Sequence, residues 1–80
     1  AYALGREMGE IWEIRLGEDS SNIDRDIEDL QISDNSAVMA VEHNGEYLYN
    51  PKKYRLCAED MLIIYVSPVD IKNIERIFYR

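Results

Sequence analysis

The stretch SAVMAVEHNGEYLYNPKKYRLCAEDMLIIYV, residues 36–66, decides the fold. It opens with the apolar run Ala37–Val41, whose length suits a strand that is covered on both faces, although a short buried helix would have the same pattern. It closes with a second continuous apolar run, Met61–Val66, which is the predicted centre of a sheet. The two runs therefore predict two strands in the core of a small β-sheet.

A hairpin is predicted between these two runs. Asn44 and Gly45 tolerate the positive φ angles that a two-residue type I′ turn requires. The aromatic and aliphatic side chains of Tyr47–Tyr49 are typical of a half-buried strand. Pro51 has no N–H group to donate and favours an extended Asn50, so this strand is expected to end there.

The part of the chain before this stretch predicts a strand and then a helix. Ile11–Leu16 alternates between apolar and charged residues, so Trp12 is expected to point into the core with Ile14 and Leu16. Ser21 is the predicted N-cap of a short helix. The apolar face of that helix has the spacing i, i+4, i+7 and consists of Ile23, Ile27 and Leu30.

The part after the stretch predicts a second helix that begins near Pro68. Proline is pre-organised for the first helical position, and Ser67 with Asp70 forms a second predicted pair of capping residues. A short extra strand is possible near Tyr54–Leu56. The expected fold is a two-layer α+β domain with a small mixed β-sheet and two helices, in the order β-α-β-β-β-α.

The 80 residues have the length of one small domain, residues 1–80. A domain of this size buries only about 60% of the surface of its unfolded chain, so its stability as a monomer is marginal. The apolar content of 46% favours dimerisation, because a monomer cannot cover all of its apolar strand surface. The first residue is not Met, and no apolar run is long enough to span a bilayer. We therefore expect a piece of a larger protein that does not itself insert into a membrane.

The net charge of −7 lies in the first part of the chain. Residues 1–34 hold ten acidic and three basic residues, whereas residues 35–80 hold six of each. An acidic half repels phosphate groups, which argues against nucleic acid as a partner and against docking on anionic lipid. A cation, a basic partner surface or a merely solvated acidic face remain possible.

Catalytic groups are sparse, so we predict that the chain is not an enzyme and has no catalytic residues. His43 is the one histidine, and we expect it to be an exposed residue of the hairpin turn, with metal binding or pH sensing as the alternative. No Cys/His set has the spacing of a zinc site, so no metal site is predicted. Cys57 is the one cysteine and is expected to be a small buried apolar residue, in a protein of a reducing compartment.

The order of these motifs resembles the C-terminal domain of the TrkA family, also called the C-terminal subdomain of regulators of potassium conductance (RCK_C). The pattern is an apolar strand, a turn with Gly, a strand, Asn-Pro, Leu-x-x-Gly-Asp, an apolar strand and a helix. It extends over Gly9–Phe78, and its specificity lies in the order and spacing of short motifs. The matching residues are Val38–Val41, Asn44-Gly45, Asn50-Pro51, Leu56, Asp60 and Met61–Val66.

One position departs from the family pattern. Glu59 stands before the turn aspartate, where the family usually has Gly. A residue other than Gly with a positive φ is uncommon and somewhat strained. The resemblance therefore leaves open a reshaped turn at this position.

The resemblance implies a ligand-binding groove between two protomers. In one branch of the family a cyclic dinucleotide lies there, and the matching positions in this chain are Ala37, Val38, Asn50 and Pro51. That branch also holds phosphate with an arginine, whereas this chain has Gln31-Ile32 in that neighbourhood. Without a guanidinium group, a dianion beside an acidic helix is disfavoured. The alternative for Asn50 and Pro51 is a corner that only ends the strand.

Calcium is the second ligand that the resemblance implies, because some potassium channels of the family are opened by calcium. Glu18-Asp19 and Asp24–Asp29 are rich in carboxylates, which calcium prefers. Their spacing does not match that of an EF-hand loop. A divalent cation such as calcium and a cyclic dinucleotide therefore remain the two candidate ligands.

The resemblance implies a ligand-sensing and dimerising regulatory domain of a potassium channel or potassium transport system. The resemblance implies a cytoplasmic homodimer at the inner face of the cell membrane, with a membrane-embedded channel or transporter subunit as its partner. Ligand binding would favour one relative placement of two protomers, and this change would move the gate. The alternatives are a ligand-free dimerisation module and the same module on another membrane transporter, such as an antiporter or an anion carrier.

Overall fold

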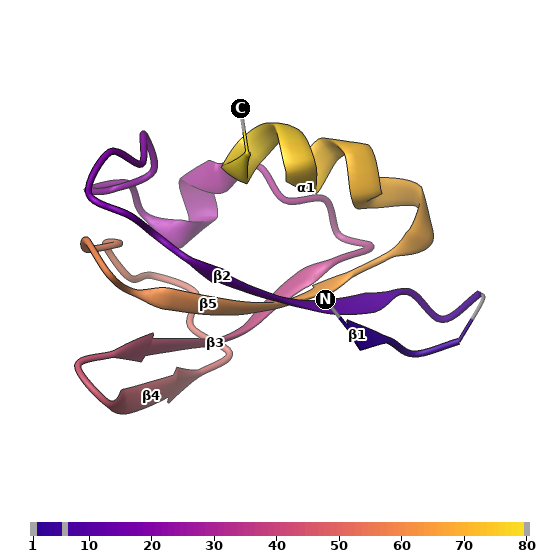
Figure 1. The fold of residues 1–80 in the computed structure, drawn as a ribbon, viewed down its shortest axis with the longest axis horizontal. Helices are drawn as coiled ribbons and strands as arrows, with labels where there is room; N and C mark the ends of the chain where they lie inside the picture. Colours follow the sequence, from indigo (N-terminus) through magenta and orange to yellow (C-terminus); the bar gives the residue numbers. More distant parts are fainter. Residues whose placement is uncertain (1, 6, 80) are drawn as a thin grey trace.

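The computed structural model describes residues 2–5 and 7–79, which form a five-stranded sheet with helical segments on one side (Figure 1). The strands are β1 (Tyr2–Ala3), β2 (Glu10–Arg15), β3 (Ala37–His43), β4 (Glu46–Tyr49) and β5 (Met61–Val66). The helical segments are the 3-10 turns η1 (Ile27–Leu30) and η2 (Pro68–Asp70) and the helix α1 (Ile71–Phe78). The α+β class is thus confirmed. The predicted mixed sheet is wrong, because each pair of neighbours in the order β1-β2-β5-β3-β4 is antiparallel.

The predicted central strand is confirmed, because β5 pairs with both β2 and β3. Its side chains alternate, so that Leu62, Ile64 and Val66 are fully buried while the residues between them are partly exposed. The buried side faces α1 and η1, which lie on the same side of the sheet (Figure 1). Within residues 2–5 and 7–79, no helix is long and apolar enough to span a membrane.

The first predicted strand is confirmed within one residue at each end, as β2. Trp12, Ile14 and Leu16 are buried, as their alternation predicts. The edge strand β1, which the sequence did not predict, pairs Tyr2 with Ile11 of β2. The core therefore contains the predicted face of β2, and β1 only extends the sheet outside it.

The first predicted helix is wrong except for its last turn, η1. Asp24 has a φ of 70°, which interrupts any helix that starts at Ser21, and Asp26 rather than Ser21 precedes the turn. Gln31, with a φ of 61°, then ends it. Ile27 and Leu30 are buried, so the apolar spacing correctly identified part of the core but not the helix length.

This segment pairs with the chain at residues 54–56 instead of forming a helix. Asp24 N donates to Leu56 O over 2.8 Å, and Asp26 and Arg55 form an isolated antiparallel bridge. The backbone N–H groups that would donate within a helix therefore donate to a distant part of the chain. In place of the extra strand near Tyr54–Leu56, the structure has this isolated bridge at Arg55.

The backbone angles of the turns between β3 and β5 test the local predictions made for them. Asn44 and Gly45 have φ angles of 51° and 86°, as the type I′ turn requires. Glu59 keeps the left-handed conformation that the family pattern gives to Gly, with a φ of 69°. The expected extended Asn50 is wrong: its φ is 49°, and its N–H donates to Met39 O over 2.8 Å. Asn tolerates this conformation better than most residues, and it turns the chain sharply away from β4.

The last helical segment begins at Pro68, as predicted. The Ser67 hydroxyl caps it by accepting from the N–H of Val69 over 3.4 Å. The carboxylate of Asp70 does not complete a capping pair with Ser67. It accepts instead from the hydroxyls of Ser33 and Ser36, which lie just before β3.

Candidate functional site

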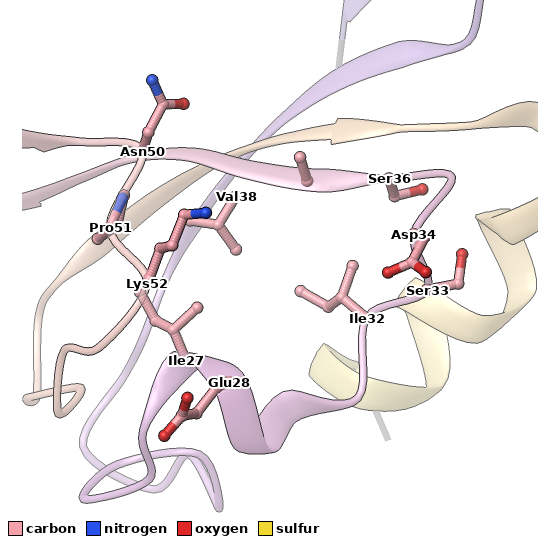
Figure 2. A pocket seen from close by; sticks show the side chains of 11 residues that line it. Ile27, Glu28, Ile32, Ser33, Asp34, Ser36, Val38, Asn50, Pro51 and Lys52 are labelled. Atoms are coloured by element: carbon pink, nitrogen blue, oxygen red, sulfur yellow. The ribbon is translucent and has the colours of Figure 1, made fainter.

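The predicted site residues Ala37, Val38, Asn50 and Pro51 line the same open pocket of about 420 Å³ (Figure 2). Two segments that are distant in sequence form its walls: residues 27–38 on one side and residues 50–52 on the other. The pocket thus lies between the start of β3 and the corner that follows β4. Apolar side chains and polar groups share its lining, so it can contact both a flat apolar ring and hydrogen-bonding groups.

The left-handed Asn50 shapes one wall of this pocket. Its amide points away from Ile32 and Ser33 in Figure 2, whereas the Lys52 side chain reaches toward Val38. The peptide that follows Asn50 carries Pro51 and Lys52 along the pocket. Asn50 therefore sets the course of the backbone here, and its amide group points away from the opposite wall of the pocket.

The charge of the pocket is mixed. Among residues 2–5 and 7–79, its lining contains the cationic side chain of Lys52 and the acidic side chains of Glu28 and Asp34. The lining therefore carries no excess of positive charge, and an anionic ligand would depend on Lys52 and on hydroxyl or backbone donors. Ile32, one of the two residues in the neighbourhood where the resembling branch has its arginine, lies in the lining.

The wall formed by residues 33–36 is fixed from behind by Asp70. Its Oδ2 accepts from the hydroxyls of Ser33 and Ser36, and the Ser36 oxygen in turn accepts from the N–H of Ser67 over 2.9 Å. The two hydroxyl donors hold the pKa of Asp70 below its ordinary value, because they stabilise the ionised form. This network ties the pocket wall to the start of η2.

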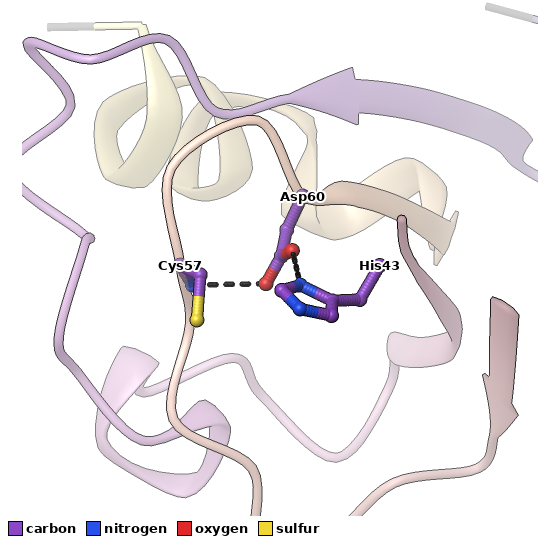
Figure 3. A group of neighbouring side chains, drawn as sticks. All are labelled: His43, Cys57 and Asp60. Atoms are coloured by element: carbon purple, nitrogen blue, oxygen red, sulfur yellow. Dashed lines mark hydrogen bonds and ion pairs between the residues drawn. The ribbon is translucent and has the colours of Figure 1, made fainter. Parts of the chain in front are cut away.

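A second group of polar side chains lies at the other end of β5. His43 at the end of β3, Cys57 in the loop between β4 and β5, and Asp60 just before β5 each offer one ligand atom, and these three atoms lie within 4.8 Å of one another. Figure 3 shows the Asp60 carboxylate between the His43 ring and the Cys57 backbone. Asp60 is 1% exposed.

Three donors surround the Asp60 carboxylate. Its Oδ2 accepts from the Tyr54 hydroxyl over 2.8 Å and from the Cys57 N–H over 2.9 Å, and its Oδ1 lies 2.6 Å from His43 Nδ1. Burial and the bond to Asp60 raise the pKa of Tyr54, so its hydroxyl remains protonated and donates. The expectation that His43 is an exposed turn residue is wrong, because His43 is the last residue of β3, is partly buried and bonds the buried carboxylate of Asp60.

The sequence did not predict this group, because zinc-type spacing requires several Cys and His residues close together in the chain. Here the fold brings together one residue of each type over an interval of 18 positions. Cys57 is also only partly buried, which differs from the expected buried apolar residue. The useful signal was Asp60 itself, since the resemblance matches it as the turn aspartate.

No protein-family model matches the sequence, and no curated protein matches it. Among solved structures, the RCK_C domain dimer of S. agalactiae BusR in complex with c-di-AMP matches with a TM-score of 0.67 and 18% identity, over 84% of this chain and 92% of that chain. S. agalactiae BusR in complex with its busAB-promotor DNA matches with the same TM-score and identity, over 95% of this chain and only 38% of that chain. The fold that the resemblance implied is thus confirmed: this chain has the fold of an RCK_C domain.

Proposed function

We propose that this chain is a dimerising regulatory domain that senses a small ligand at the pocket beside Asn50 and Pro51. The observation that carries the proposal is that Ala37, Val38, Asn50 and Pro51, from two distant segments, line one pocket. The fold supports it further, since the BusR domain of the same fold is a dimer in complex with c-di-AMP.

Dimerisation is supported by exposed apolar side chains next to the pocket. Met39, Tyr47 and Tyr49 are 41%, 48% and 74% exposed, and the two tyrosine rings stack with centroids 6.1 Å apart. These residues adjoin the corner at Asn50, whose N–H bonds Met39 O. The edge strand β4 also leaves one side of its backbone without a strand partner in residues 2–5 and 7–79. If a second copy covered this surface, the pockets of both protomers would lie at the dimer interface.

The dimer can be tested by sedimentation velocity over a range of concentrations. We expect a homodimer for the unmodified chain, and a shift toward monomer when Tyr47 and Tyr49 are both changed to Ser, because stacked aromatic rings contribute strongly to interfaces. The matched control is Tyr2→Ser, which removes a tyrosine of similar exposure from the opposite edge strand. A chain that remains monomeric at high concentration would contradict the proposed dimer.

We propose a cyclic dinucleotide as the ligand class, with c-di-AMP as the probe. Its purines would pack on apolar wall residues such as Ile32 and Val38, and its phosphates would bind Lys52 and the nearby donors. Isothermal titration calorimetry should show binding to the unmodified chain. Ala37→Trp, which fills the pocket from the start of β3, should abolish it. Ala58→Trp, at an exposed alanine outside the pocket, should leave it unchanged.

A specific observation favours the ligand-free dimerisation module as second candidate. The acidic side chains of Glu28 and Asp34 outnumber Lys52 in the pocket, which weakens any attraction for a dianion. A stable dimer without heat on addition of c-di-AMP or of calcium would favour this candidate. Binding of calcium alone, lost in a variant with Asp34→Asn, would instead assign the pocket to a divalent cation.

The larger assembly that we propose is a cytoplasmic part of a potassium channel or potassium transport system, at the inner face of the membrane. In it, the ligand's differential affinity for two placements of the protomers would set how far the gate moves. Other carriers of the module are an antiporter, an anion carrier, or a DNA-bound regulator, since BusR was solved with promoter DNA. Co-purification of the full-length protein with a membrane subunit, against retention on promoter DNA, would distinguish these contexts.

A further inference from the structure

We propose that His43, Cys57 and Asp60 form a binding site for a divalent transition-metal ion of the zinc type. The ligand atoms come from three parts of the fold: the end of β3, the loop after residue 56 and the turn into β5. They lie within 4.8 Å of one another, close enough for one ion to reach all three after small side-chain movements. This site lies at the opposite end of β5 from Asp70, which supports the ligand pocket, and it does not depend on the proposed function of that pocket.

The donor set selects the metal. One imidazole nitrogen, one thiolate sulfur and one carboxylate oxygen suit a borderline-soft ion such as Zn²⁺ or Co²⁺. Calcium and magnesium prefer oxygen ligands alone and would gain little from Cys57 and His43. Three protein ligands leave a fourth, tetrahedral position, and the partial exposure of His43 and Cys57 gives water access to it.

The surroundings already orient the carboxylate for this role. Both donors to Oδ2, the Tyr54 hydroxyl and the Cys57 N–H, hold the group so that Oδ1 faces His43. Partners of this kind fix the direction of a metal ligand and commonly change metal affinity by about 10–100-fold when removed. Tyr54 is thus a positioning residue for the proposed site.

Binding requires a modest movement and a redistribution of protons. A tetrahedral ion with bonds of about 2.0 Å separates two light ligand atoms by roughly 3.3 Å, so His43 Nδ1 must move away from Asp60 Oδ1 by about 0.7 Å. The half-exposed His43 ring at the end of a strand has room for this shift. The thiol proton of Cys57 leaves to solvent. The ring proton moves from Nδ1 to Nε2, which faces the Asn44 amide at 3.3 Å and can donate to the oxygen of that amide once it rotates.

Cobalt titration under a non-thiol reductant tests the proposal directly. We expect one Co²⁺ per chain, with the visible absorption of a tetrahedral ion and a thiolate-to-cobalt charge-transfer band. Excess Zn²⁺ should remove both signals by displacement, because Zn²⁺ binds such sites more tightly than Co²⁺. Cys57→Ser should eliminate the charge-transfer band, and His43→Gln should weaken cobalt binding by at least about tenfold.

Two further variants distinguish a site formed by several residues from metal binding by the Cys57 thiol alone. Tyr54→Phe should keep the charge-transfer band but weaken binding by about tenfold, because Asp60 loses one of its orienting donors. The matched control Glu46→Gln removes a charge from the same hairpin as His43 and should bind as the unmodified chain does. The proposal would be overturned if excess Co²⁺ produced no charge-transfer band, or if His43→Gln left the band and the affinity unchanged. The latter result would mean that Cys57 binds the metal alone.

Discussion

The two buried aspartates at the ends of β5 have nearly the same burial and very different partners. Asp60, before the strand, is 1% exposed and Asp70, after it, is 7% exposed. Asp70 accepts from two serine hydroxyls, which have no strong affinity for a metal ion. Asp60 accepts from a backbone N–H and a tyrosine, and it adjoins an imidazole and a thiol. Both carboxylates hold distant loops together, but Asp60 lies beside the side chains of His43 and Cys57, which are of the types that bind transition metals, and Asp70 bonds two serine hydroxyls.

Among the changes that test this comparison, removal of the Asp60 carboxylate is expected to have the largest effect. Asp60→Ala leaves the partly buried Cys57 N–H and Tyr54 hydroxyl without their acceptor. We expect it to lower the free energy of unfolding by about 3 kcal/mol, since each orphaned polar group costs about 1–3 kcal/mol. Urea denaturation followed by circular dichroism measures this change.

Two variants make the result on Asp60 specific. Asp60→Asn keeps one oxygen as an acceptor and should cost less than Asp60→Ala. Asp19→Ala removes an exposed carboxylate and should stay within about 0.5 kcal/mol of the unmodified chain. An Asp60→Ala chain as stable as Asp19→Ala would show that the turn does not depend on this carboxylate.

The next effect concerns Asp70 and pH. Its pKa lies below the ordinary value because the Ser33 and Ser36 hydroxyls favour the ionised form, so this group stabilises the fold above the ordinary Asp pKa of about 3.9. That contribution is lost as the pH falls through the lower pKa of the folded state. Ser36→Ala removes one donor and should raise the pKa of Asp70 toward its ordinary value.

A pH titration of the carboxyl carbons by NMR measures the pKa of Asp70 in each chain. The matched control is Ser21→Ala, an exposed serine that lies in a different loop and should leave this pKa unchanged. If Ser36→Ala also leaves it unchanged, the hydroxyls are not the cause of the low pKa. The stability difference between Ser36→Ala and the unmodified chain should in addition become smaller below about pH 4.

Local patterns predicted β2, β3, β4 and β5 because each of them carries its own signal, whereas the two-residue β1 carries none. The alternation at Trp12 and the continuous run of β5 were sufficient for two strands, and Asn44-Gly45 fixed the hairpin. The prediction of the first helix failed because Asp24 is left-handed and the segment pairs with residues 54–56, a long-range contact that no local window contains. Tertiary pairing overrides propensity in such a segment.

The two sites also differ in how far the sequence predicted them. The four pocket residues followed from the order of motifs in the resemblance, and the structure places them in one lining, although ligand binding there stays a prediction. The group at His43, Cys57 and Asp60 could not be predicted, because only the antiparallel return of β5 beside β3 brings its members together. A site made of single residues from three segments has no spacing that a sequence can reveal.

The smallest expected effect sharpens the comparison at the turn before Asp60, where Glu59 has a φ of 69°. A left-handed residue other than Gly costs about 1–2 kcal/mol, whereas Gly loses about 0.5–1 kcal/mol more backbone entropy on folding. Glu59→Gly should therefore stabilise the fold by about 0.5 kcal/mol, which urea denaturation can resolve. The Glu59 side chain is exposed, and its backbone bonds to Arg15 and Leu16 would survive the change.

The control for Glu59→Gly is Ala58→Gly, at the preceding residue. It should instead destabilise the fold slightly, because no positive φ is relieved there. Equal losses in both variants would mean that the turn before Asp60 stores no strain, and that Asp60, like Asp70, is held by its hydrogen bonds alone.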